Sequence, residues 1–186
     1  KFIDTLFIKD EHEQAEMLKQ FSYRVSKTLN KNEILSELID VIQKMVNVDR
    51  VYVCLMDSKG EFHVEKSHSQ LDNLFDIGKD HPIVDFMYDI DGCALISDFE
   101  SSADYRSMWE TEKLQLQGRE IQCIVPMKDN DELIGIVLLS KKAKGKPYTY
   151  TDFNNLSSVS SVCSMAVKNS NLYEKAYDEA RKDELT

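Results

Sequence analysis

The four cysteines are the side chains of this sequence that could take part in the widest range of reactions. Cys54, Cys93, Cys123 and Cys163 lie 30 to 40 residues apart, and the chain contains no Cys-x-x-Cys pair. Zinc ribbons and thioredoxin-like redox sites both need closely spaced cysteines. A free cysteine is also one of the residue types most often buried in a protein core. We therefore expect reduced core thiols rather than a zinc ribbon or a thioredoxin motif.

The histidines and the candidate phosphate-binding motif offer little further chemistry. His63 and His68 are five residues apart on or beside a predicted strand, so their side chains point to opposite faces and do not form a metal pair. His12-Glu13 lacks the second histidine of a zincin motif, and Gly145-Lys146-Pro147 lacks the flanking glycines of a phosphate loop. The sequence predicts no metal site and no catalytic residues.

Polar and aromatic side chains alternate with aliphatic ones along the predicted strand at 51–56. The period of two places Tyr52, Cys54 and Met56 on one face, and Val51, Val53 and Leu55 on the other. A polar and aromatic face suits a small-molecule pocket better than a helix interface, and ordinary core packing is the alternative. The residues predicted to line this pocket are Tyr52, Cys54, Phe62, Tyr105, Trp109 and Gln122.

One long helix over 149–186 is the element around which the rest of the chain is arranged. Thr149 and Asp152 have the spacing of a capping box, and Tyr148 and Phe153 have that of a hydrophobic staple, so the helix start is well specified. In its first half two apolar stripes run side by side, and in its second half one stripe remains among charged residues. We expect the first half to pack on both a body and a partner, and the second half on a partner alone.

One stripe of this helix has the repeat of a coiled coil. Its members alternate steps of three and four residues, which is the spacing of a left-handed coiled coil. The seam predicts a parallel homodimer, and its small members contribute little burial, so we expect weak packing that changes register easily. The predicted dimerisation residues are Leu156, Val159, Cys163, Ala166, Ser170, Tyr173, Tyr177 and Ala180.

Composition limits the possible partners. A chain of 186 residues with 42% hydrophobic content can bury one good core. Its net charge of -10 disfavours nucleic acid and anionic membrane surfaces, but is compatible with a small cationic ligand. The apolar stretch at residues 1–9 is too short, and too often interrupted by polar residues, for a signal peptide or a membrane span. We expect a cytoplasmic fragment whose two ends are cut from a longer chain.

The remaining elements predict an α+β domain. Helices are expected over 11–29 and 33–46, and a hairpin over 51–56 and 61–67, followed by short helices and loops over 70–92. Ser101 or Ser102 can cap a helix that carries Tyr105, Met108 and Trp109. The last strands are expected at 93–96, 120–127 and 133–140, before a basic turn at 142–146.

This order of elements resembles that of GAF domains, and the residues agree. Residues 120–127 (EIQCIVPM) and 132–139 (ELIGIVLL) are similar to the paired strands of that family, and 147–152 (PYTYTD) is similar to the start of its last helix. The resemblance covers 29–173. It implies an antiparallel sheet with helices on one face and, on the other, a small-molecule pocket roofed by 70–118. The expected domains are a signalling helix at 1–30, a GAF domain at 31–168 and a coiled-coil linker at 169–186.

The resemblance also suggests individual site residues. Asp98 follows a predicted strand where the family places ligand-contacting polar groups, and helix capping is its alternative role. Lys141, Tyr148 and Asp152 match part of the pattern of cyclic-nucleotide-binding members, but Ser140 and Phe153 replace its Asn and Glu. The alternative is that Asp152 caps the helix, Tyr148 staples it and Lys141 pairs with Asp152.

Two specialised branches of the family fit less well. Bilin-binding members attach the chromophore through a cysteine followed by histidine, which this chain lacks, and Ser97-Asp98-Phe99 is only a remnant of their Asp-Ile-Pro element. Free methionine sulfoxide reductases use redox cysteines, for which Cys93 and Cys123 are candidates, but their Gly-x-Cys-Gly element is missing. A redox enzyme of this kind stays an alternative to a sensor.

The last residues resemble the junction between a coiled coil and a GGDEF diguanylate cyclase domain. The sequence Asp183-Glu184-Leu185-Thr186 is similar to the start of that family's Asp-x-Leu-Thr-Gly-Leu motif. The resemblance implies a sensory module that binds a small ligand, forms a homodimer and controls a C-terminal cyclase in cyclic di-GMP signalling. A degenerate GAF domain that only spaces and dimerises is the remaining alternative.

Overall fold

The computed structural model describes residues 2–69 and 76–185. It contains one six-stranded antiparallel sheet with the strand order β3-β2-β1-β6-β5-β4. The strands are β1 (Val51–Met56), β2 (Phe62–Ser67), β3 (Asp76–Ile77), β4 (Ala94–Leu95), β5 (Ile121–Asp129) and β6 (Glu132–Ser140). Part of the predicted roof, 70–75, lies outside the described residues.

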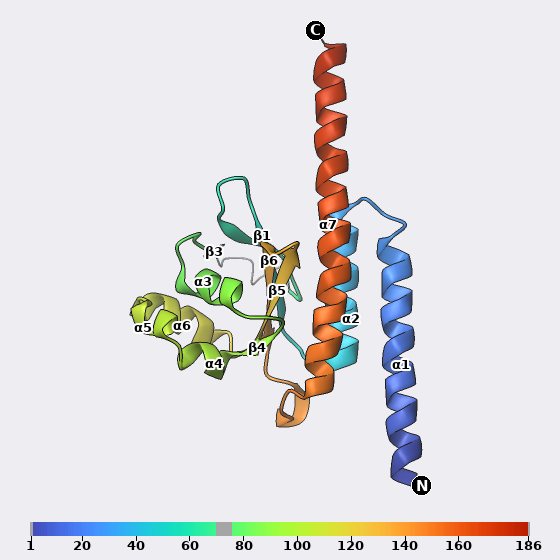
Figure 1. The fold of residues 1–186 in the computed structure, drawn as a ribbon, viewed down its shortest axis with the longest axis vertical. Coiled ribbons are helices and arrows are strands. Elements are labelled where there is room, and N and C mark those ends of the chain that lie inside the picture. The colour runs from blue at the N-terminus through green and yellow to red at the C-terminus, as the bar shows by residue number, and fades with distance from the viewer. Residues whose placement is uncertain (1, 70–75, 186) are drawn as a thin grey trace.

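Two long helices, α2 (Lys31–Val46) and α7 (Tyr150–Glu184), cover one face of the sheet, a third, α1 (Phe2–Val25), packs on their outer side, and four short helices lie on the other face, as Figure 1 shows. The short helices, which we call the lid, are α3 (Pro82–Asp89), α4 (Ile96–Glu100), α5 (Ala103–Ser107) and α6 (Glu110–Gly118). A 3-10 turn, η2 (Ala143–Gly145), precedes α7. The α+β architecture predicted from the sequence is confirmed.

The sheet separates two hydrophobic cores. The helix-side core includes Val51, Val53 and Leu55, and the lid-side core includes Tyr52 and Cys54, so the predicted division of β1 between its two faces is confirmed. Along β6, Val137 and Leu139 join the helix-side core and Leu138 joins the lid-side core. Because β6 is buried on both faces, it is the central strand that its continuous apolar run predicts.

The start of α7 is fixed as the sequence predicts. Thr149 Oγ1 accepts from the Asp152 backbone N–H at 3.2 Å, and Asp152 Oδ2 accepts from the Thr149 N–H at 2.7 Å. The rings of Tyr148 and Phe153 stack with their centroids 6.3 Å apart. The suggested Lys141–Asp152 pair is wrong, because Lys142 Nζ lies 2.6 Å from Asp152 Oδ2 and Lys141 pairs with Glu120 instead.

Several other predicted boundaries are wrong. The first helix spans Phe2–Val25 rather than 11–29, and Asn30, whose side chain accepts from the Glu33 N–H at 3.3 Å, caps the following helix α2. The predicted strand at 93–96 is limited to β4, since α4 starts at Ile96. Ser102 caps α5 as expected, but that helix ends before Met108 and Trp109.

The structure divides the predicted dimerisation seam. Leu156, Val159 and Cys163 belong to the helix-side core, and the buried Ser170 hydroxyl donates to the Leu29 carbonyl at 2.6 Å. These four side chains are covered by their own chain and are therefore not open to a partner. Sequence periodicity shows that a stripe is covered, but not by what. The members that stay at least partly accessible are Ala166, Tyr173, Tyr177 and Ala180.

Two glycine substitutions test the packing of the central strand. A Cβ on Gly135 of β6 would lie 2.8 Å from the Cys54 carbonyl oxygen and 2.9 Å from Leu55 Cδ2, whereas one on Gly118 of α6 would meet nothing within 4 Å. We expect Gly135→Ala to lower the free energy of unfolding by about 1–3 kcal/mol, as overpacking does. Gly118→Ala is the matched control and should not destabilise, because alanine favours helix more than glycine does. Urea unfolding followed by circular dichroism measures both, and equal stabilities would contradict the packing described.

Candidate functional site

Local hydrogen bonds build the lid above the sheet. The His81 Nδ1 caps α3 by accepting from the Ile83 N–H at 3.1 Å, and the Ser102 hydroxyl caps α5 by accepting from the Tyr105 N–H at 3.1 Å. His81 must be neutral at Nδ1 to accept, and burial lowers the pKa of this side chain, which favours that form. The rings of Phe86 on α3 and Phe99 on α4 pack against each other with their centroids 5.0 Å apart. The short lid helices are thus held by caps above a shared aromatic core.

A pocket of about 390 Å³ lies between the lid and the edge of β5. Its wall is apolar where Ile96, Leu116 and Ile121 face it. Two of the predicted pocket residues, Tyr105 and Gln122, come together here from the lid and the sheet. A volume in this range and a wall of apolar and convergent polar groups are typical of small-molecule sites.

Charged groups surround the polar side of this pocket. Lys141 Nζ lies 2.6 Å from Glu120 Oε1, and Arg50 is 3.7 Å from the other carboxylate oxygen. Lys141 is the main cause that holds the pKa of Glu120 below its usual range. Lys113 Nζ lies 5.2 Å from the centre of the Tyr105 ring. The pocket therefore offers an aromatic face and groups of both charges to a polar ligand.

Comparison with known proteins places this geometry in a family. The family model described as GAF domain matches residues 30–167, well over half of the chain. The chain belongs to the GAF domain family. A comparison with curated proteins gave no match.

Solved structures support the same fold. The GAF domain/HD domain protein from Geobacter sulfurreducens has a TM-score of 0.63 at 17% identity, with 77% of this chain and 96% of that chain covered. Residues 122 to 287 of a methyl-accepting chemotaxis protein give 0.65 at 16% identity, covering 82% and 98%. The chromophore-binding domain of an unusual bacteriophytochrome from R. palustris gives 0.68 at 10% identity, covering 88% and 63%. At such identities the likeness shows the fold.

Three predicted pocket residues lie deeper in this GAF domain. Tyr52, Cys54 and Phe62 are essentially fully buried in the lid-side core. The rings of Tyr52 and His68 are nearly perpendicular with their centroids 5.4 Å apart, and the Arg119 guanidinium lies 5.9 Å from the centre of the Tyr52 ring. These side chains have the surroundings of packed core, and none of them lines the pocket of about 390 Å³.

The last two predicted pocket residues lie away from that pocket. Asp98 is on α4, where its carboxylate accepts from the Leu95 N–H at 3.1 Å, which is the capping role considered as its alternative. The Trp109 side chain is 76% exposed between α5 and α6. Helix α6 itself was missed by the sequence analysis, although it supplies Lys113, Leu116 and Gln117 to the pocket wall.

The four thiols of this GAF domain are poorly suited to redox catalysis. Burial raises the pKa of Cys54 to about 12, that of Cys93 to about 11 and that of Cys163 to about 12. Burial also raises the pKa of Cys123 well above its ordinary value. Since the thiolate is the reactive form, these surroundings disfavour nucleophilic attack by any of the four.

The same surroundings predict a labelling pattern. At neutral pH, Cys54, Cys123 and Cys163 should react with a thiol reagent many times more slowly in the folded protein than in urea, because they are buried and protonated. The half-buried Cys93 should react first, and Cys93→Ser should remove the fastest phase. Mass spectrometry after short exposure identifies the labelled residue. Rapid labelling of Cys123 would contradict this assignment.

Proposed function

We propose that this GAF domain is a cytoplasmic sensory module that binds a small molecule under its lid, forms a parallel homodimer and controls a C-terminal diguanylate cyclase domain. Two sensory proteins share its fold, a methyl-accepting chemotaxis protein and the chromophore-binding domain of a bacteriophytochrome. A sensory role for this chain extends that likeness from fold to function.

One observation carries the proposal, namely that α7 belongs to two parts of the molecule. It is a single helix of 35 residues whose buried face ends at Ser170. Beyond this point it leaves the body, as Figure 1 shows, and carries the exposed Leu172, Tyr173 and Tyr177. An exposed apolar stripe on a charged helix favours a partner helix.

The surface beside this stripe is suited to a second copy of the chain. A groove of about 350 Å³ lies between the end of α1 and α7, with Val25, Leu29, Val162 and Met165 in its wall. Tyr173 and Tyr177 follow its wall residue Asn169 at steps of four along the same helix, which places them on the same side of α7. A parallel dimer through this surface would place the C-terminal ends of the two α7 helices next to each other.

A physical path connects the pocket with α7 through β5. Ile121 and Gln122 line the pocket at the start of this strand. Further along, the carbonyl of Pro126 accepts from the buried Ser160 hydroxyl of α7 at 2.7 Å, and Asp129 at the end of β5 pairs with Lys168. A ligand changes the position of α7 only if it binds the two arrangements with different affinity.

The nature of the output rests on the end of the sequence. The resemblance of Asp183-Glu184-Leu185-Thr186 to the first GGDEF motif implies a diguanylate cyclase, which joins two nucleotides held on separate subunits. Such an enzyme depends on how its two catalytic domains face each other. A dimer of α7 rods would set that facing.

A spacing and dimerising role is the second candidate. The full burial of Tyr52, Cys54 and Phe62 favours it, because these side chains fill the lid-side core. The two candidates share the dimer and differ in whether the pocket at the edge of β5 takes a ligand.

Substitutions at the pocket separate these candidates. We expect native mass spectrometry of the purified chain to detect a bound small molecule, which Gln122→Trp should abolish because a large side chain there fills the pocket. Gln115→Trp is the matched control, on an exposed position of α6 that does not line the pocket. If wild type, control and variant all carry nothing, the spacer role is favoured over the sensor.

Substitutions on the free half of α7 test the dimer. Tyr173 and Tyr177 are 55% and 57% exposed, so replacing both by Glu should leave the body folded and shift a dimer toward monomer in sedimentation velocity runs. Tyr150→Glu, at an exposed position near the start of α7, is the control. The buried Val159 would not serve, since a charge there disrupts the core. Unchanged sedimentation of the double variant would contradict the proposed interface.

A further inference from the structure

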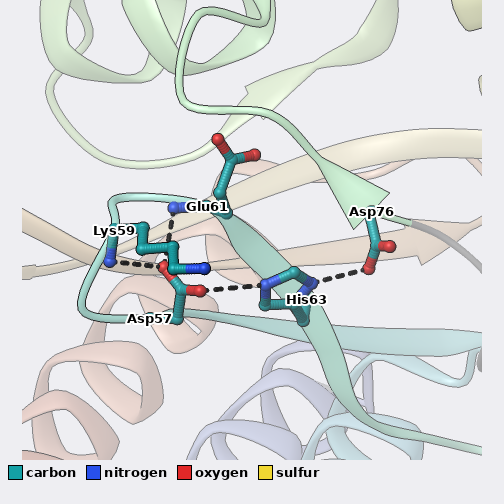
Figure 2. Close-up of polar contacts among 5 residues, drawn as sticks. All are labelled: Asp57, Lys59, Glu61, His63 and Asp76. Atoms are coloured by element: carbon teal, nitrogen blue, oxygen red, sulfur yellow. Dashed lines mark hydrogen bonds and ion pairs between the residues drawn. The ribbon is translucent and has the colours of Figure 1, made fainter.

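A histidine lies between two carboxylates at the end of the sheet near which α7 leaves the body. His63 of β2 directs Nδ1 at Asp76 Oδ1, 2.8 Å away, and Nε2 at Asp57 Oδ2, 3.2 Å away (Figure 2). Asp57 follows β1 and Asp76 is the first residue of β3. The three side chains thus join two strands and a turn.

The contacts of this cluster indicate how many protons the His63 ring carries. A neutral imidazole donates from one ring nitrogen only, whereas an imidazolium donates from both. Both nitrogens of His63 face a carboxylate oxygen, so both contacts are favourable only when the ring carries two protons. The hydrogen bonds to Asp76 and then Asp57 raise the pKa of His63, which supports the same protonation state.

The two carboxylates are held differently. Asp57 Oδ1 also accepts from the backbone N–H groups of Lys59 at 2.7 Å and Glu61 at 3.0 Å, and the Lys59 bond is the main cause that lowers the pKa of Asp57. Among the described residues, Asp76 has His63 as its one hydrogen-bonding side-chain partner. When the ring loses a proton, Asp76 is therefore the group that can withdraw.

Asp76 belongs to a short strand at the edge of the sheet. In the part of the chain that the structure describes, strand β3 consists of Asp76–Ile77 and pairs with β2, through Phe62–Ile77 and His63–Asp76. Ile77 is fully buried in the lid-side core, and the chain continues from it into α3 of the lid. The His63–Asp76 contact is thus a side-chain tie on an edge strand that leads into the lid.

We propose that His63 is a proton-binding site that controls the attachment of β3, and with it the start of the lid, to the sheet. When the His63 ring carries both protons, it donates hydrogen bonds to Asp76 and to Asp57, and β3 is held to the sheet. The sign follows from the raised pKa: the tie is fully present below the ordinary pKa of histidine and is lost as pH rises through the higher pKa of the folded state. Protons would then be a second input to the sensor.

Other charged groups near His63 contribute to the electrostatic environment of its ring. Glu65 is two residues along β2, and a groove of about 420 Å³ brings further charges of both signs toward the cluster. Across this groove lie Lys31 of α2, the Asp129–Lys168 pair, Glu132 of β6 and Lys175 of α7. Within residues 2–69 and 76–185, no three His, Cys, Asp or Glu side chains form a group that could hold a metal ion. A proton is the ligand that fits the cluster.

Two measurements on the full chain test the proposal. A proton–carbon NMR titration, with the His63 signal assigned from His63→Gln, should give a pKa above the ordinary value in wild type and a lower one in Asp76→Asn. Amide exchange of β3, corrected for its intrinsic pH dependence, should accelerate several-fold relative to its value at lower pH as His63 loses its proton. In Asp76→Asn that step should disappear. The Asp76 side chain is 72% exposed, so this variant should fold.

Controls separate this histidine from the others. His12→Gln, on α1, should leave both readouts unchanged. His81 titrates in the opposite sense, since burial lowers its pKa, so its effect on the lid appears as pH falls. A His63 pKa that is ordinary in wild type and unchanged in Asp76→Asn would overturn the proposal. Exchange of β3 that shows no step at the His63 titration would overturn it equally.

Discussion

The packing of α7 on the sheet is the constraint on which the rest of this structure depends. Leu156, Val159, Cys163 and Val167 place one face of the helix in the helix-side core, and each large aliphatic side chain buried in this way stabilises by about 1.5–3 kcal/mol. The buried Ser160 and Ser170 would cost free energy without partners, but their hydroxyls donate to the carbonyls of Pro126 and Leu29. The packing of α7 on the sheet is therefore both stabilising and specific in register, because a helix shifted along its axis would lose these hydrogen bonds.

Polar contacts hold α7 at both limits of this buried face. At its start, Asp152 completes the capping box and pairs with Lys142. Near its end, Lys168 pairs with Asp129 of the β5–β6 hairpin while Ser170 bonds to the linker between α1 and α2. The last turn before the free half of α7 thus contacts both the sheet and the N-terminal helices, so either can bias its position.

Sequence patterns predicted the elements that local chemistry specifies. The cap and staple at Thr149 and Tyr148 and the two faces of β1 follow from residue spacing, and the central position of β6 follows from its continuous apolar run. Helix α6 was missed because Glu110–Gly118 is largely polar and its two leucines, Leu114 and Leu116, are two residues apart and form no apolar stripe at helical spacing. The seam was only partly informative, since a stripe at helical spacing looks alike whether its own chain or a partner covers it. The His63 cluster depends on β3 returning beside β2 after an intervening segment, and no local pattern encodes that return.

The continuity of α7 has a mechanical consequence. No break separates its anchored half from its free half, and Glu184, 14 residues after Ser170, lies about 21 Å further along the axis at the rise of an α-helix. Because this exposed part of α7 is long and continuous, a small tilt of the helix is magnified along it. A tilt too small to disturb the core displaces the C-terminal end of α7 by several times the displacement at Ser170. Whatever is joined to that end experiences the larger movement.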